Sequence, residues 1–227
     1  MITNIAKDRA RTIEIETRPS PSHSIIWLHG LGADGNDFVP VVEQLALPNL
    51  GIRFIFPHAP LMPVTINGGF VMRAWYDILD ADLALNEEDE RGLRASESTI
   101  TALLDKETRR GIPASRIVLA GFSQGGAIAL QTGLRYARKL AGMLVLSGYL
   151  PLISKVERER NAVNQLTPVF MGHGTIDNVV PMSLGVASRA HLTQSGYSVE
   201  WHEYPMMHGV CEDELADVSA WLSKVLL

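Results

Sequence analysis

A single stretch, residues 117–127, constrains the fold of this chain more than any other. Its apolar beginning, Ile117 to Ala120, predicts a buried strand, and Ala127 to Gln131 predicts a helix. Between them, Gly121-Phe122-Ser123-Gln124-Gly125 matches the G-x-S-x-G pattern, in which a serine occupies a strained turn from strand to helix. Flanking glycines avoid the clash that a Cβ would make in so tight a turn. The pattern alone also occurs in structural turns, but this strand-turn-helix setting favours a nucleophile at Ser123.

Apolar strands alternate with helices along the rest of the chain. Residues 12–17 alternate between apolar and charged and predict an edge strand, and apolar runs predict further strands at 24–28, 52–56, 116–122, 141–147, 168–172 and 197–204. Helices are expected at 38–47, 96–110, 124–136, 183–193 and 212–227. This order indicates a mostly parallel central sheet with helices on both faces. With no internal repeat and no linker, we expect one α/β domain over residues 1–227.

Composition and charge argue against several classes of protein. Hydrophobic residues make up 46% of the 227 positions, enough for a large core, and the net charge of −5 comes without a basic cluster for nucleic acid. The charge run at residues 87–91 is expected to be a solvated loop. The lone cysteine, Cys211, excludes an internal disulfide and fits a reducing compartment. Since neither a signal peptide nor a membrane-spanning run is recognisable, we expect a soluble, cytoplasmic protein.

Three polar residues that each follow a different predicted strand form a candidate catalytic triad. In a parallel sheet, functional residues gather on loops at the carboxyl ends of the strands. Ser123, Asp177 and His208 lie on such loops, in the chain order that is expected when the nucleophile lies on an elbow. Ser123 would attack an acyl carbonyl, His208 would accept and return its proton, and Asp177 would orient His208.

A tetrahedral oxyanion also needs hydrogen-bond donors. The residue after the nucleophile, Gln124, supplies one backbone N–H. The second is expected from the glycine-rich loop that follows the strand at 24–28, at the N–H of Leu31.

Each of these assignments has a rival. His29, His58 and His173 also follow strands, but a role in loop hydrogen bonding is favoured, because the base should follow the last strand. Asp77 is the rival acid, and it is disfavoured because it precedes the elbow. Cys211 lies near His208 but is expected to be a small buried hydrophobe rather than a nucleophile.

No metal or cofactor is indicated by the motifs. The seven histidines show neither H-x-x-x-H spacing nor the H-E-x-x-H pattern. Gly30-Leu31-Gly32 lacks the third glycine of a dinucleotide-binding loop.

Together these segments resemble a known family, the bacterial carboxylesterase and acyl-protein thioesterase/lysophospholipase branch of the α/β-hydrolases. The resemblance covers nearly the whole chain and rests on HGLGADGNDF at 29–38, FPHAP at 56–60, RAWYD at 73–77, GFSQGGA at 121–127, LSG at 146–148, HGTID at 173–177 and YPMMH at 204–208. It implies the α/β-hydrolase fold, the same triad and oxyanion donors, and hydrolysis of esters or thioesters without a cofactor. One departure is that Met207 and Gly209 flank His208, where relatives often carry glycine before it and a small hydroxyl residue after it.

The segment from 61 to 73 is the predicted specificity element. It is apolar, has no clean period and contains Gly68-Gly69, which could act as a hinge. We interpret it as a lid or wall over an acyl pocket, with an ordinary packed loop as the alternative. The side chains expected to contact the substrate are Leu61, Met62, Phe70 and Trp75.

These observations predict a serine carboxylesterase that acts on short- to medium-chain acyl esters through an acyl-enzyme. The alternative is an acyl-protein thioesterase or lysophospholipase for longer chains. A third hypothesis, a non-catalytic relative that only binds, is disfavoured by the intact triad. The expected partner is a small acyl ester or thioester, and an apolar patch on the segment 61–73 could form a homodimer face.

Overall fold

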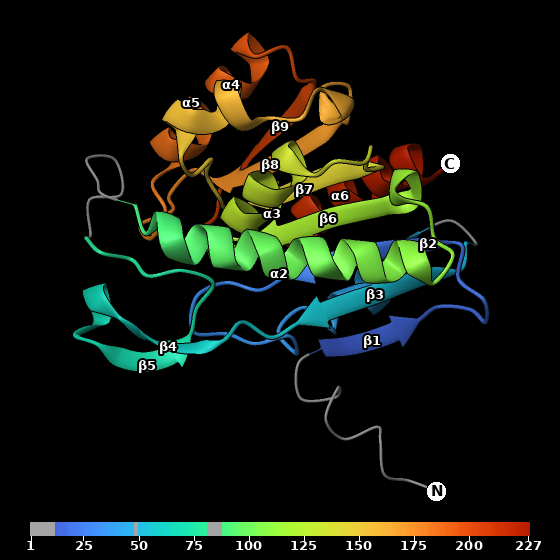
Figure 1. The fold of residues 1–227 in the computed structure, drawn as a ribbon, viewed down its shortest axis with the longest axis horizontal. Helices are drawn as coiled ribbons and strands as arrows, with labels where there is room; N and C mark the ends of the chain where they lie inside the picture. The colour runs from blue at the N-terminus through green and yellow to red at the C-terminus, as the bar shows by residue number, and fades with distance from the viewer. Residues whose placement is uncertain (1–11, 48–49, 81–87) are drawn as a thin grey trace, which may run out of the picture.

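The computed structural model describes residues 12–47, 50–80 and 88–227, and its centre is a seven-stranded sheet (Figure 1). The strand order is β1-β3-β2-β6-β7-β8-β9, and every neighbouring pair is parallel except β1 with β3. The strands of this sheet are β1 (Thr12–Glu16), β2 (His23–Leu28), β3 (Ile52–Pro57), β6 (Ile117–Phe122), β7 (Gly142–Leu146), β8 (Val169–Gly174) and β9 (Val199–Tyr204). The predicted mostly parallel sheet is therefore confirmed, and the predicted edge strand is β1, which the structure shows to run antiparallel to β3.

Helices and short 3₁₀ turns connect the strands. The α-helices are α1 (Val41–Gln44), α2 (Glu90–Arg109), α3 (Gln124–Arg135), α4 (Val156–Glu159), α5 (Met182–Gln194) and α6 (Glu212–Leu226). The 3₁₀ turns are η1 (Thr65–Asn67), η2 (Ala114–Arg116), η3 (Ile153–Lys155) and η4 (Ala162–Asn164). Within the described ranges, none of the helices combines the length and the apolar character that crossing a membrane requires.

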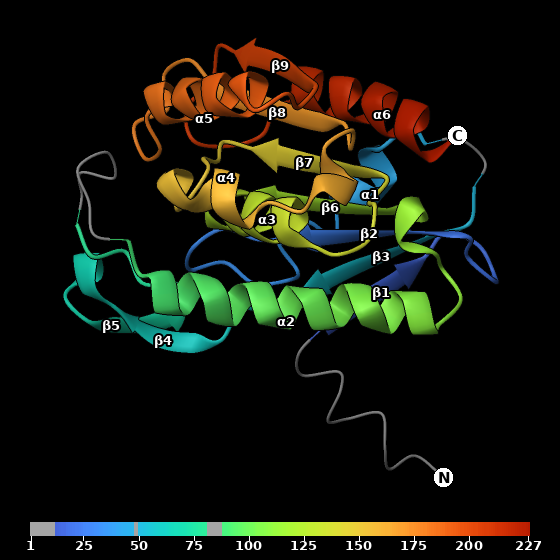
Figure 2. The ribbon, with the colours of Figure 1, turned by 45° about the horizontal axis from the view of Figure 1, so that its top comes forward.

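Helices cover both faces of the sheet, as the apolar strands predicted. Side chains alternate along each strand, so that Ile26 and Leu28 of β2 join a core with α2 and α3, whereas Ile25 and Trp27 join a second core with α1 and α6. Figure 2 shows the sheet between these helices. This burial on both faces explains why the central strands are apolar at most consecutive positions rather than at alternate ones.

The predicted lid segment forms a separate two-stranded antiparallel hairpin, β4 (Leu61–Val64) and β5 (Phe70–Arg73), with η1 between the strands. Gly68 and Gly69 close its turn with φ angles of 64° and 78°, a left-handed conformation that glycine adopts without strain. The hairpin lies near the start of α2, at the end of the molecule toward which the parallel strands point (Figure 2).

Two predictions of local structure are corrected. The helix expected at 38–47 is reduced to α1, because the chain before it forms i→i+3 turns and Pro40 has no N–H to donate. The charge run expected as a solvated loop instead leads into α2, which begins at Glu90 within the run, and Glu87 lies outside the described residues. Asp89 is the N-cap of this helix, and its side chain accepts a hydrogen bond from the Gly92 N–H.

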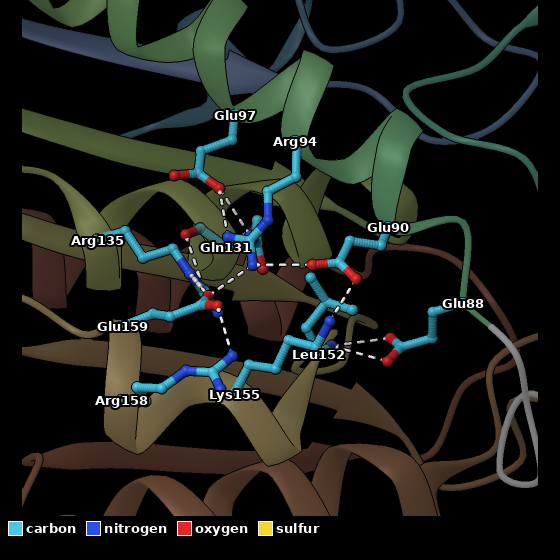
Figure 3. Close-up of polar contacts among 10 residues, drawn as sticks. All are labelled: Glu88, Glu90, Arg94, Glu97, Gln131, Arg135, Leu152, Lys155, Arg158 and Glu159. Atoms are coloured by element: carbon cyan, nitrogen blue, oxygen red, sulfur yellow. Dashed lines mark hydrogen bonds and ion pairs between the residues drawn. The ribbon is translucent and has the colours of Figure 1, made fainter.

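Ion pairs tie α2 and α3 to the segment that follows β7 (Figure 3). Glu159 accepts hydrogen bonds from Arg94 at 2.7 Å and from Arg135 at 2.9 Å. Burial alone would raise the pKa of Glu159, but these two guanidinium groups outweigh burial and lower the pKa to about 2. Nearby, both carboxylate oxygens of Glu88 accept the Leu152 N–H. The network therefore holds this segment against the start of α2.

Glu214, in the first turn of α6, predicts an unusual dependence of stability on pH. The side chain is fully buried, and neither carboxylate oxygen has a hydrogen-bond partner among the described residues. Burial, with a smaller contribution from Asp217, raises its pKa to about 8. The folded protein therefore retains a proton that the unfolded chain releases near pH 4.3. The free energy of unfolding should thus fall by about 1.4 kcal/mol per pH unit between these two pKa values.

Glu214→Gln, which cannot ionise, is expected to match the wild type near pH 4 and to exceed its stability near pH 8. Urea denaturation of both proteins at the two pH values measures this difference. A wild-type stability that loses nothing relative to the variant between these pH values would contradict the prediction.

Candidate active site

Ser123 occupies the turn between β6 and α3 in a strained backbone conformation. Its φ angle of 55° and ψ angle of −121° lie in a region that residues other than glycine rarely adopt. A Cβ on Gly121 would lie 2.3 Å from the backbone of Gly125, and a Cβ on Gly125 would lie 2.3 Å from the Leu28 carbonyl oxygen. Both glycines of the pattern are therefore required by backbone packing, as the sequence predicted.

The structure brings the three predicted triad side chains together in one relay. The Nε2 atom of His208 lies 2.9 Å from the Ser123 Oγ, and its Nδ1 atom lies 2.7 Å from the Asp177 Oδ2. Because a carboxylate only accepts, Nδ1 carries the proton and Nε2 is left to accept the serine proton. The Phe122 ring packs against the His208 imidazole, with 4.7 Å between ring centroids.

Asp177 is itself held in place by the loop after β8. Its Oδ1 atom accepts the backbone N–H groups of Val179 and Val180, both at 2.9 Å, which leaves Oδ2 for His208. Behind it, a Cβ on Gly174 would lie within 2.4 Å of the Met206 carbonyl oxygen, so this loop packs tightly on the loop of His208. Met207 points outward and is exposed, so the sequence departure there leaves the relay geometry intact.

Two backbone N–H groups lie in the loops next to Ser123 without a hydrogen-bond partner among the described residues, those of Leu31 and Gln124. Gln124 is the first residue of α3, where backbone N–H groups have no partner within the helix. The loop of Leu31 is in contact with the elbow, since a Cβ on Gly30 would lie 3.4 Å from the Cβ of Ser123. These are the two donors that the sequence predicted for an oxyanion.

The other histidines that follow strands make loop hydrogen bonds, as predicted. His29 accepts the Ala59 N–H at Nε2 and donates from Nδ1 to the Gly30 carbonyl, and burial lowers its pKa to about 4, so it is neutral. His58 accepts the Gly35 N–H. His173 donates to the Val180 carbonyl, with its pKa lowered by burial.

Asp77, the rival acid, and Cys211 both lie outside the relay of Ser123, His208 and Asp177. Asp77 accepts the Thr65 N–H at 2.7 Å and the Thr65 hydroxyl, so its carboxylate holds the hairpin turn rather than a histidine. Cys211 is partly exposed directly before α6, which corrects the expectation of a buried thiol.

A cavity of about 210 Å³ opens beside Ser123. The candidate oxyanion residues Leu31 and Gln124 line one part of it. Most of the remaining lining is apolar or aromatic and comes from four separate segments, with Ile66, Tyr76, Ile78, Tyr149, Val179 and Val180. Ile66 and Val179 are exposed to solvent, whereas Tyr76, Tyr149 and Val180 are buried, so the cavity runs inward from an apolar mouth.

The four side chains expected to contact substrate do not line this cavity. Leu61 and Phe70 are 65% and 67% exposed on the hairpin strands, and Met62 lies with Trp75 at a separate hollow against α2. Trp75 is only 2% exposed and donates its indole N–H to the His29 carbonyl.

The hairpin does reach the cavity, but through its turn, at Ile66 and Asn67. Three of the cavity residues that the sequence missed follow the rule that located the triad. Tyr149 comes just after β7, and Val179 and Val180 come just after Asp177, all at the carboxyl edge of the sheet.

Comparisons with known proteins place the whole chain in one family. The model of the Phospholipase/Carboxylesterase family matches residues 10–226. Acyl-protein thioesterase 1 of Neurospora crassa is 41% identical over 89% of this chain and 86% of its own, and that of Yarrowia lipolytica is 35% identical over 93% and 96%.

Solved structures agree with this placement. Zea mays acyl-protein thioesterase 2 is 31% identical and superposes with a TM-score of 0.83 over 96% of this chain and 99% of its own. Arabidopsis thaliana SOBER1 is 32% identical, with a TM-score of 0.86 over 90% and 99%. These relatives are fungal and plant proteins, so the bacterial part of the resemblance is not supported. The chain therefore belongs to the phospholipase/carboxylesterase family, adopts its α/β-hydrolase fold and is a serine hydrolase.

Proposed function

We propose that this chain is an acyl-protein thioesterase, which hydrolyses the thioester between an acyl chain and a cysteine of another protein. The relay from Asp177 through His208 to Ser123, beside an apolar cavity, is the observation that carries the proposal. The choice of thioester over oxygen ester is supported by the names of relatives at 35–41% identity. The carboxylesterase predicted from the sequence is less specific, and the alternative prediction of an acyl-protein thioesterase agrees better with these relatives.

In the proposed mechanism, His208 Nε2 takes the proton of the Ser123 hydroxyl as Oγ attacks the thioester carbonyl. The N–H groups of Leu31 and Gln124 donate to the resulting oxyanion. Collapse of this intermediate breaks the C–S bond, His208 returns the proton to the sulfur, and the acyl group stays on Ser123. Water then attacks this ester with His208 again as base, which releases a fatty acid and free Ser123. Asp177 stabilises the imidazolium in both steps.

The apolar cavity is the proposed site for the acyl chain. Its buried part lies next to Ser123 and its mouth carries the exposed Ile66 and Val179, so a chain attached to Ser123 would bury apolar surface along its length.

The testing experiment compares S-acyl-cysteine and O-acyl-serine peptides of one sequence, with chains from acetyl to palmitoyl and Ser123→Ala as the blank. The expected result is a higher kcat/KM for thioesters, rising with chain length. A maximum of kcat/KM for short oxygen esters would instead identify the protein as a general carboxylesterase. No turnover above the Ser123→Ala blank on either series would refute the proposed function.

Ile66→Ala should reduce chain-length discrimination, because it removes apolar surface from the mouth of the cavity. We expect kcat/KM for the palmitoyl substrate to fall about tenfold relative to the acetyl substrate, within the 1–3 kcal/mol range for apolar pocket contacts. Phe70→Ala is the matched control, since it shortens an exposed side chain of the same hairpin that does not line the cavity. An equal change in both variants would contradict the assignment of the cavity and support a role for the whole hairpin.

A further inference from the structure

We propose that the side chains of Gln124 and Trp75 are positioning residues, which hold the two oxyanion donors at a fixed separation. This inference rests on the proposed function. The two donors come from different loops, one after β2 and one at the start of α3. Since each must lie about 2.7–3.1 Å from the same oxyanion, their relative position has to be maintained by other groups. Trp75, expected from the sequence to touch substrate, takes this different role.

The carboxamide of Gln124 forms two hydrogen bonds to the segment that follows the hairpin. Its Oε1 atom accepts the Trp75 N–H at 2.8 Å, and its Nε2 donates to the Tyr76 carbonyl at 2.7 Å. Only one orientation of the amide satisfies both contacts, and the side chain is almost fully buried. The residue that offers a backbone N–H to the oxyanion is thus fastened through its own side chain to Trp75 and Tyr76.

Trp75 extends this connection to the loop of the other donor. Its indole N–H donates to the His29 carbonyl at 2.8 Å, and its own carbonyl accepts the hydroxyl of Ser96 from α2. The carbonyl of His29 lies just two residues before Leu31. Gln124, Trp75 and His29 therefore form an unbroken chain of hydrogen bonds between the two donor loops.

The Leu31 peptide is then held from both sides. The His29 Nδ1–H donates to the Gly30 carbonyl at 2.7 Å, and the Gly32 N–H donates to the Arg73 carbonyl at 2.9 Å. These contacts involve the Gly30 carbonyl and the Gly32 N–H, on either side of Leu31. The Leu31 N–H itself has no partner among the described residues. The loop of Leu31 is thus attached to Arg73 and Trp75. Gln124 hydrogen-bonds to the same segment, at Trp75 and Tyr76.

Direct packing of the two donor loops makes this arrangement sensitive to small movements. A Cβ on Gly125 would lie 2.3 Å from the Leu28 carbonyl oxygen and 2.6 Å from that of His29. Because residues 75–76 hydrogen-bond to Gln124 and Trp75 also hydrogen-bonds to the His29 carbonyl, a shift of these residues would strain this close contact and move one donor loop against the other. Misplacement by about 1 Å can cost about 100-fold in rate.

The test uses Trp75→Phe, which removes the indole N–H but keeps an aromatic ring, and Gln124→Glu, which removes the donor to Tyr76. Trp27→Phe is the matched control. Trp27 is as buried as Trp75, but its indole N–H has no partner among the described residues, so this variant loses volume without losing a hydrogen bond. The measurements are kcat, KM, the inhibition constant of a trifluoromethyl ketone that forms a tetrahedral adduct with Ser123, and thermal stability.

We expect Trp75→Phe and Gln124→Glu to lower kcat by about 10- to 100-fold with KM within about threefold. The inhibition constant of the ketone should rise by the same factor as kcat falls, because both report stabilisation of the oxyanion. Trp27→Phe should lose stability but keep kcat and the inhibition constant within about threefold. If Gln124→Glu fails to fold, the result for Trp75→Phe alone decides whether these side chains position the oxyanion donors.

The positioning role is overturned if folded Trp75→Phe keeps the wild-type kcat and ketone affinity. It is also overturned if only KM changes in this variant. Labelling of Ser123 by a fluorophosphonate separates this outcome from failure of the proposed function. If the wild type labels but hydrolyses no ester or thioester, the proposed substrate class is wrong, and slower labelling of Trp75→Phe than of Trp27→Phe still supports positioning. Equal labelling rates overturn it, and a wild type that neither labels nor hydrolyses overturns both.

Discussion

Asp177→Asn is expected to lower kcat by about 10⁴-fold while the fold remains intact. The Oδ1 atom of Asp177 accepts two backbone N–H groups, from Val179 and Val180. An asparagine would keep its oxygen on these donors and turn its NH₂ group toward His208. The imidazole would then accept at Nδ1 and carry its proton on Nε2, so it could no longer take the proton of Ser123.

Steady-state kinetics of the variant, with Ser123→Ala as the floor, measure this effect. Asp213→Asn is the control for the same chemical change, because Asp213 is exposed at the start of α6. Unfolding by urea should show nearly equal stability for both asparagine variants and the wild type. A kcat within about tenfold of the wild type would show that Asp177 does not set the tautomer of the base.

Glu107→Ala is expected to destabilise the protein by about 3–5 kcal/mol, the usual cost of breaking a buried ion pair. Glu107, on α2, is fully buried although it carries a carboxylate. Its Oε2 atom accepts the Ser24 hydroxyl at 2.6 Å and Arg53 at 2.8 Å, and its Oε1 accepts Arg110 at 2.8 Å. Removing this carboxylate leaves the nearly buried guanidinium of Arg53 with Glu16 as its remaining carboxylate partner.

Urea denaturation measures the loss, and Glu200→Ala provides the control. Glu200 pairs with Lys224 at 3.7 Å and with His202 at 3.2 Å, and all of these side chains are at least partly exposed, so its removal should cost no more than about 1 kcal/mol. Equal losses in the two variants would mean that the buried position of Glu107 adds nothing to its contribution.

Much of the fold followed from local sequence patterns. The elbow at Ser123 is a strand-turn-helix unit whose glycines lie next to one another in the chain, so its conformation is predictable without distant contacts. The central strands of the sheet were found because burial on both faces leaves runs of consecutive apolar residues in them. Misassignments arose where side-chain hydrogen bonds or prolines decided the outcome, as with Asp89 at the start of α2 and Pro40 before α1.

The triad candidates were predictable for a related reason. Ser123, Asp177 and His208 each follow a strand, and the carboxyl ends of parallel strands meet at one edge of the sheet whatever the lengths of the connections. Order along the chain and position after a strand are properties that a sequence displays directly. The structure adds the distances, 2.9 Å and 2.7 Å, that join the three side chains into a relay.

The sequence alone thus determined the fold class and the side chains that are candidates for the chemistry, because both depend on local pattern and order. Only the tertiary structure decided which residues surround the acyl cavity and which residues support the oxyanion donors. Ile66, Tyr149 and Val180 come from segments far apart in the chain, and they meet through packing that no periodicity displays. An indole such as that of Trp75 can contact a ligand or hold a backbone, and its partner in the folded chain, the His29 carbonyl, distinguishes the two.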